Sequence, residues 1–148
     1  ISTWDVSGVT DMKELFCDSS YSWDSCYNSG ASSFNEDIGT WDTSGVTSMY
    51  AMFGSNEGFN RDLSDWAVDS VTEMSYMFSY ARSFNQDLGW CVDDGVDLDY
   101  AFSSTLCEST SCGVTQGGCA SWFGSDAAPK TQFTSFGALL GAAALLML

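Results

Sequence analysis

The feature that most constrains this fold is a motif that returns every 25 residues. It reads Phe-Asn-x-Asp followed by Ile or Leu, and it begins at Phe34, Phe59 and Phe84. A unit of this length is too short to bury an apolar face alone, so neighbouring units have to stack and share one core. The period therefore predicts a repeat solenoid whose function belongs to its surface.

Each unit continues with Trp, then Val-Thr, then Met, then Met-Phe. Complete copies run over 34–53 and 59–78, a partial copy precedes them at 4–16, and a fourth, at 84–102, loses register. The stretch from Ile or Leu through Trp to Val predicts one short parallel strand per coil. The apolar spacing i, i+3, i+4 within 49–53 and 74–78 predicts a short helical turn. The expected fold class is an α/β repeat solenoid.

Residues locked to the period are assigned to structural roles. The recurring aspartates Asp37, Asp62 and Asp87 are expected to bind backbone N–H groups at the corner of each coil. The asparagines of the same motif are expected to form an internal ladder, with glycan contact as the alternative: Asn35, Asn60 and Asn85. Six aromatic residues are expected to stack in columns inside the core, with an exposed binding strip as the alternative: Trp41, Trp66, Phe53, Phe78, Phe59 and Phe84.

Six cysteines lie outside the regular repeats, at Cys17, Cys26, Cys91, Cys107, Cys112 and Cys119. An even count suits disulfides in an oxidising compartment, whereas a zinc site needs closer cysteine pairs or histidine, and the chain has no histidine. We expect Cys17 to pair with Cys26. The other four allow three connectivities, and local loop closure favours Cys91 with Cys107 and Cys112 with Cys119.

Trp4 and Trp41 are 37 residues apart, so the first unit carries an insertion near Cys17 to Tyr27. At the other end, 91–122 is expected to be a disulfide-stabilised cap completing the solenoid of 1–122, followed by a linker at 123–135 and an apolar tail at 136–148. Small residues from Ser125, a spacer and that tail match a glycosylphosphatidylinositol (GPI) attachment signal, with the lipid attached at Ser125. A membrane helix cut short is the alternative.

Composition narrows the chemistry. The net charge of -16 repels phosphate backbones, which argues against nucleic acid as a partner. Without histidine, Ser-His-Asp and Cys-His nucleophile systems are excluded, and no phosphate-binding or dinucleotide motif occurs, so no cofactor is expected. The acidic run at 93–99 resembles a calcium loop but lacks its ordering and final Glu, which favours a solvated turn. A carboxylate-dependent glycosidase stays as the rival enzyme class.

The order Phe-Asn-x-Asp, Trp-Asp-x-Ser-x-Val-Thr-x-Met and Met-Phe resembles the BspA-type surface-protein repeat of about 25 residues, over residues 1–102. The resemblance implies a right-handed, leucine-rich-repeat-like stack displayed at the cell surface, with adhesion or protein binding as its role and no catalytic motif. Ile1 falls in mid-repeat, so the chain is expected to be a piece of a longer protein.

These observations favour a non-catalytic cell-surface or secreted protein, anchored in the membrane through its C-terminus, that binds an extracellular protein or glycan. A carbohydrate-binding or structural cell-wall protein is the alternative. Partner recognition has to use residues that differ between coils. Five aromatic residues of the insertion and the adjoining variable face are the candidates: Tyr21, Trp23, Tyr27, Tyr50 and Tyr76.

Overall fold

The computed structural model describes residues 1–18, 26 and 31–119 of the 148-residue chain. Some predicted features fall outside these residues: Tyr21, Trp23 and Tyr27 of the insertion, the end of the cap at 120–122, the linker 123–135 with Ser125, and the tail 136–148. What the sequence indicates for them stays a prediction.

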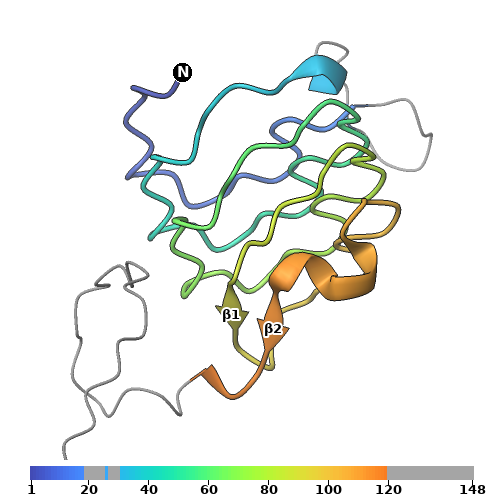
Figure 1. The fold of residues 1–148 in the computed structure, drawn as a ribbon. Helices are drawn as coiled ribbons and strands as arrows, with labels where there is room; N and C mark the ends of the chain where they lie inside the picture. The colour runs from blue at the N-terminus through green and yellow to red at the C-terminus, as the bar shows by residue number, and fades with distance from the viewer. Residues whose placement is uncertain (19–25, 27–30, 120–148) are drawn as a thin grey trace, which may run out of the picture.

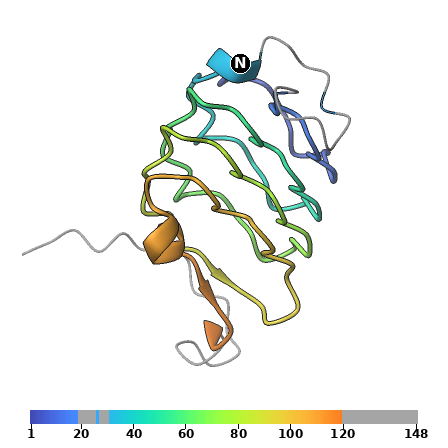
Figure 2. The same cartoon turned by 90° about the vertical axis from the view of Figure 1, so that its right-hand side faces the viewer.

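Regular elements are few and short in the described chain. In order, they are the 3-10 helix η1 (Ala31–Ser33), strand β1 (Cys91–Val92), the 3-10 helix η2 (Glu108–Gly113) and strand β2 (Thr115–Gln116). Strands β1 and β2 pair in parallel, with Cys91 opposite Thr115 and Val92 opposite Gln116. The N-terminal segment and this strand pair lie at opposite ends of the molecule in both views (Figure 1 and Figure 2).

Between these ends, successive units of the chain lie side by side as parallel coils (Figure 2). Isolated parallel bridges join Asp11 to Ser48, Ser48 to Glu73 and Glu73 to Asp97. The bridged residues are 37, 25 and 24 positions apart. Residues one sequence repeat apart are therefore the ones that lie side by side in neighbouring coils. Each of these coils contributes a single bridged residue here, because the backbone enters a turn immediately afterwards.

The stretch Met49–Phe53 forms hydrogen-bonded turns where a helical turn was expected. Met52 N donates to Met49 O at 3.2 Å within the coil, whereas Ala51 N donates to Ser75 O of the next coil at 3.0 Å. Ala51 and its equivalent Tyr76 have φ of 46° and 58°, in the left-handed region, which ends any helix. Every second backbone N–H of this stretch thus donates to a carbonyl of the neighbouring coil. In a helix these N–H groups would bond within their own coil, and the neighbour's carbonyls would lack donors.

The tryptophans form one column of the core. The ring of Trp66 lies between those of Trp41 and Trp90, with centroids 6.5 Å away on each side and interplanar angles of 2° and 8°. Each indole also donates to a carbonyl of the preceding coil, as Trp66 Nε1 does to Ile38 O at 3.0 Å. The column therefore joins coils by apolar stacking and by satisfying a buried backbone acceptor.

Two phenylalanine columns complete the stack of rings. Phe53 and Phe78 lie 5.2 Å apart, Phe59 and Phe84 lie 6.0 Å apart, and the two columns touch where Phe53 meets Phe59 at 4.0 Å. All six aromatic residues predicted for the core are at most 4% exposed. Their predicted burial is confirmed, so these rings are not an exposed binding strip.

Three disulfides close the cysteine-rich segments. Cys17 pairs with Cys26 around the insertion, the pairing expected there. The local pairing expected for the other four is wrong, because Cys91 pairs with Cys119 and Cys107 with Cys112. Parallel pairing of β1 with β2 explains the difference. It carries the chain through a crossover before β2 returns beside β1, and this places Cys119 next to Cys91 rather than next to Cys112.

Candidate functional site: a tyrosine face and its pocket

A row of tyrosines lies on the side of the stack where the inter-coil turns occur. Tyr50 and Tyr76 meet edge to face with centroids 6.0 Å apart, and Tyr76 stacks on Tyr100 at 5.2 Å with an interplanar angle of 12°. Tyr100 is 62% exposed, so the row is a surface feature beside the core columns. We call Tyr50, Tyr76, Tyr80 and Tyr100, with the neighbouring Lys13, the tyrosine face.

The backbone register builds this face. Tyr76 N donates to Asp99 O at 2.9 Å, which sets Tyr76 beside Tyr100 in the next coil. Tyr76 and Tyr100 share the left-handed conformation, with φ of 58° and 56°. Tyr80 N donates to Ser103 O at 2.8 Å, and this hydrogen bond aligns the residues after Tyr76 with the next coil in the same way. The same inter-coil hydrogen bonds that replace the expected helical turns therefore place the tyrosines.

Lys13 occupies one end of the tyrosine face. Its Nζ lies 4.7 Å from the centroid of the Tyr50 ring and 3.5 Å from Glu14 Oε1. An ammonium over an aromatic face is attracted by the ring's quadrupole, and a nearby carboxylate adds to this attraction. This end of the row already holds a cation between a ring and an acid.

A pocket of about 430 Å³ opens at the other end of the tyrosine face. It lies between two coils and the start of η2. Its lining residues are Tyr76, Ser79, Tyr80, Tyr100, Ser103, Ser104 and Glu108. Glu108 is fixed at the rim because its Oε2 accepts a hydrogen bond from Ser104 N at 3.0 Å. The pocket thus combines three tyrosines, three serines and one carboxylate.

This combination suits binding of a partner group. Tyrosine offers rigid amphipathic contact area at a low entropy cost, and serine hydroxyls add adaptable hydrogen bonding. A glycosidase of the usual kind needs two carboxyl groups flanking the scissile bond, whereas Glu108 is the single acid in the pocket lining. The arrangement can hold an apolar or cationic group against the rings and position it with polar contacts.

The structure brings Tyr50 and Tyr76 together, two of the five residues proposed from the sequence for partner contact. The other three, Tyr21, Trp23 and Tyr27, lie outside the described residues. Sequence reasoning missed Tyr80 and Tyr100. A signal existed for both: Tyr80 follows Tyr76 by four residues, and Tyr100 follows it by 24, close to the repeat period.

The asparagine ladder forms, but at the surface. Asn60 N donates to Asn35 Oδ1 at 3.0 Å, and Asn85 N donates to Asn60 Oδ1 at the same distance. Asn60 and Asn85 are exposed, so the expected internal position is wrong. The corner of the coil carries the ladder because the aromatic columns fill the interior.

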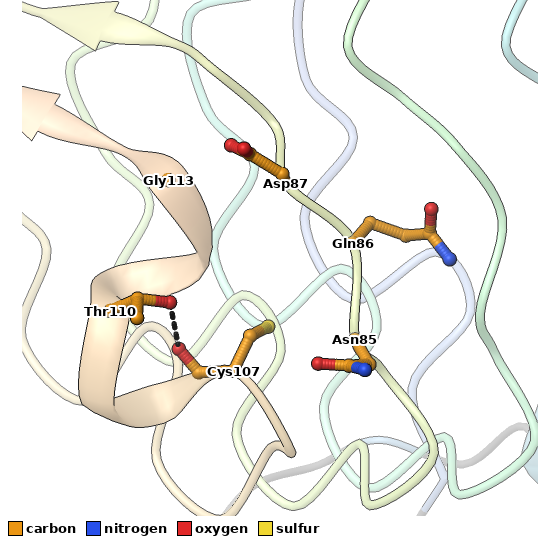
Figure 3. Close-up of a pocket in the computed structure, with 6 residues that line it drawn as sticks. All are labelled: Asn85, Gln86, Asp87, Cys107, Thr110 and Gly113. Carbon is orange, nitrogen blue, oxygen red and sulfur yellow. Dashed lines mark hydrogen bonds between the residues drawn. The ribbon is translucent and has the colours of Figure 1, made fainter.

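A second pocket, of about 250 Å³, lies where the ladder meets η2. In Figure 3 the side chains of Asn85 and Asp87 point toward η2, whereas Gln86 points away from it. Thr110 Oγ1 donates to Cys107 O at 3.0 Å on the opposite wall. The lining is polar and carries no aromatic ring, which makes it a weaker binding candidate than the tyrosine pocket.

Aspartates at the coil corners serve the backbone. Asp37 Oδ1 accepts from Gly39 N at 3.1 Å and Asp62 Oδ1 from Ser64 N at 2.9 Å, which confirms the predicted corner role for these two residues. The hydrogen bonds from the Ser64 backbone, and then from its hydroxyl, hold the pKa of Asp62 below its usual value. These two carboxylates therefore stabilise turns.

The acidic run at 93–99 is held by protein atoms. Asp97 Oδ1 accepts from Asp99 N at 2.9 Å, and Gln116 Nε2 donates to Val96 O at 2.7 Å. In the described part of the chain, no group of three or more His, Cys, Asp or Glu side chains gathers as a metal site would require. Nor does any helix among those residues have the length and apolar character needed to cross a membrane.

Comparison with protein families gives a match over most of the chain. A family model described as "Mycoplasma protein of unknown function, DUF285" matches residues 1–111. No curated protein and no solved structure was found to match the chain. The matched residues, 111 of 148, span the coils, the tyrosine face and most of η2. The chain therefore belongs to the family of the Mycoplasma protein of unknown function, DUF285.

Proposed function

We propose that the chain is a non-catalytic interaction module of the cell surface that mediates adhesion or binding to another protein. We assign its coils to a right-handed, leucine-rich-repeat-like solenoid of the BspA type. The tyrosine face is the proposed contact surface. The observation that carries the proposal is the 430 Å³ pocket between Tyr76, Tyr80 and Tyr100.

The tyrosine face has the properties of a contact surface. Tyr100 is 62% exposed, so its ring adds little to the core. Trp, Tyr and Arg dominate the energetics of protein interfaces because their large side chains desolvate well when a partner covers them. Tyr76 and Tyr100 are held in place by inter-coil hydrogen bonds and by each other, so little freedom is lost on binding.

Three disulfides support a site of action outside the reducing cytosol. Under this proposal the repeat region is extracellular, and the apolar tail from residue 136 serves as a lipid-anchor signal, with Ser125 as the attachment residue. The Cys17 to Tyr27 insertion is proposed to contribute to partner contact as well. No cofactor and no nucleic acid take part.

A carbohydrate-binding or structural cell-wall role is the second candidate. Aromatic rings beside hydroxyl groups also suit sugar recognition, and the tyrosine pocket provides both. The rival enzyme reading, a carboxylate-dependent glycosidase, has only Glu108 in that pocket to support it.

Binding of the fluorescently labelled full chain to intact cells and to extracellular matrix tests the proposal. Saturable binding that protease treatment of the cells abolishes, with no hydrolysis of a glycan panel, is the expected result. Binding abolished by glycosidases but not by proteases would favour the carbohydrate candidate. Hydrolysis lost in a Glu108→Gln variant would overturn the non-catalytic assignment.

A further inference from the structure

We propose that the pocket of the tyrosine face binds the cationic side chain of a lysine or arginine presented by a basic protein partner. The inference rests on the proposed function, because it names the chemistry that the same surface recognises. It is carried by the aromatic walls of the pocket, by a cation already bound on the same face, and by the charge of the chain.

Aromatic rings line the pocket together with an acid. Tyr76 and Tyr100 are nearly parallel, and Tyr80 completes the lining with Glu108 at the rim. An ammonium or guanidinium within about 6 Å of a ring centroid is attracted to the negative face of the ring. A guanidinium also stacks flat on an aromatic ring and can donate to a carboxylate at its edge. Glu108 supplies that carboxylate.

Lys13 shows the same chemistry within the chain. Its Nζ lies 4.7 Å from the Tyr50 ring centroid and 3.5 Å from a carboxylate oxygen of Glu14. Tyr50 leads through Tyr76 to Tyr100 by direct ring contact. At one end of the row, a tyrosine and a glutamate thus hold a lysine of the same chain. At the other end, tyrosines and a glutamate line a pocket.

Charge complementarity favours a basic partner over a second copy of this chain. The chain has 4 basic residues against 20 acidic ones. Lys13 is engaged with Tyr50, and Arg82 Nε pairs with Glu57 at 3.5 Å. Arg61 Nε donates to Asn35 O at 2.7 Å, at the corner that carries the asparagine ladder. The net charge of -16 attracts a basic protein and repels another copy.

The probe for this proposal is N-acetyl-arginine methylamide, titrated into the full chain labelled at its tyrosine rings for NMR. The matched control ligand is the citrulline analogue, which replaces the guanidinium by a neutral urea of the same shape. The proposal predicts concentration-dependent shifts of the Tyr76, Tyr80 and Tyr100 ring signals with the arginine compound and much smaller shifts with the citrulline compound.

Variants separate a cation site from a merely apolar one. Tyr100→Leu keeps apolar area but removes the ring, and should weaken arginine binding about two- to fivefold, whereas Tyr100→Phe should keep it. Glu108→Gln should weaken binding about twofold or more. Glu36→Gln makes the same charge change at an exposed corner outside the pocket and should leave binding unchanged. Tyr100, Glu108 and Glu36 are all exposed, so these variants should fold.

Equal shifts with the two ligands, or no shift of these rings up to the solubility limit of the arginine compound, would overturn the proposal. Ring shifts produced by monosaccharides and not by arginine would also overturn it and would favour a glycan ligand. In that case the tyrosine face would still be a binding surface. If the chain binds the arginine compound but attaches to neither cells nor matrix, the proposed cation site stands and the proposed function is refuted.

Discussion

The indole Nε1 of Trp66 donates a 3.0 Å hydrogen bond to the carbonyl oxygen of Ile38, a residue 28 positions earlier. Trp41 makes the same bond to Ile1 O at 3.2 Å, and Trp90 to Leu63 O at 3.2 Å. In each of these three coils, one side chain therefore fills the core and satisfies a backbone acceptor of the preceding coil. The repeat is held together by this double use of its tryptophan.

Replacing Trp66 tests this double role. Trp66 is 1% exposed, so Trp66→Ala should lower the free energy of unfolding by about 3–5 kcal/mol as a large-to-small core change. Trp66→Phe retains a ring but leaves Ile38 O without its donor, which should cost about 1–3 kcal/mol. Urea denaturation measures both. Trp4 is 61% exposed at the equivalent position of the first coil, and Trp4→Ala is the control that should change little.

The two disulfides at the C-terminal end should differ in their contribution to stability. Cys91–Cys119 closes a separation of 28 residues and Cys107–Cys112 one of 5. The loop-entropy relation gives about 3.5 kcal/mol for the longer loop and about 2 kcal/mol for the shorter. The paired Cys→Ser variants should therefore melt at clearly different temperatures, with loss of Cys91–Cys119 the more damaging. Disulfide mapping of unreduced peptides that linked Cys91 to Cys107 would contradict the structure.

Gly113 lies where η2 crosses the corner of the preceding coil. Its φ is +77°, and a Cβ there would overlap Asp87 Oδ1. Gly113→Ala should therefore destabilise the chain by about 1–3 kcal/mol through the left-handed backbone and the overlap together. Combining it with Asp87→Ala should recover part of the loss. Gly95→Ala is the control, since open space surrounds Gly95 and its φ is not in that region.

Acidic pH should remove the stability that Asp42 contributes through its hydrogen bonds in the turn. Hydrogen bonds from the Ser44 hydroxyl, and then from its backbone N–H, hold the pKa of Asp42 below the ordinary 3.8. The ionised form is thus favoured by folding, so its contribution is present above pH 3.8 and disappears as the pH falls through the lower folded value.

The melting temperature of Asp42→Asn, followed from neutral to acidic pH, tests this linkage. The wild type should melt higher than the variant at neutral pH, and the difference should vanish in acid. Asp65→Asn removes the same charge at an exposed position and controls for general repulsion. A difference that stayed constant down to the lowest pH would contradict the assigned hydrogen bonds.

The sequence predicts best those residues that repeat in type and position. Trp41 and Trp66, or Phe53 and Phe78, recur at 25 residues because each must stack on its equivalent, so their burial could be read from spacing alone. The short elements were harder. The apolar spacing in Met49–Phe53 fits a helix. Ala51 nevertheless has a left-handed φ, which cannot be predicted from an alanine side chain.

Features that depend on the irregular last unit were missed for a physical reason. Cys91 reaches Cys119 only because β1 and β2 pair in parallel, a long-range contact that local loop closure cannot reveal. Tyr100 joins the tyrosine face although its unit is one residue shorter, since the inter-coil hydrogen bond from Tyr76 N fixes the register. Sequence reasoning did not select Tyr100, because it counts complete repeats and this unit is irregular.

Cell-binding affinity of the full chain, with and without the double change Tyr76→Ala and Tyr100→Ala, tests most directly whether the tyrosine face binds the partner. Trp4→Ala is the matched control, because Trp4 is 61% exposed and Tyr100 62%. Loss of two tyrosine anchors should weaken binding about tenfold or more in a variant that still unfolds cooperatively, while the control binds like the wild type. Wild-type affinity in the folded double variant would contradict the account.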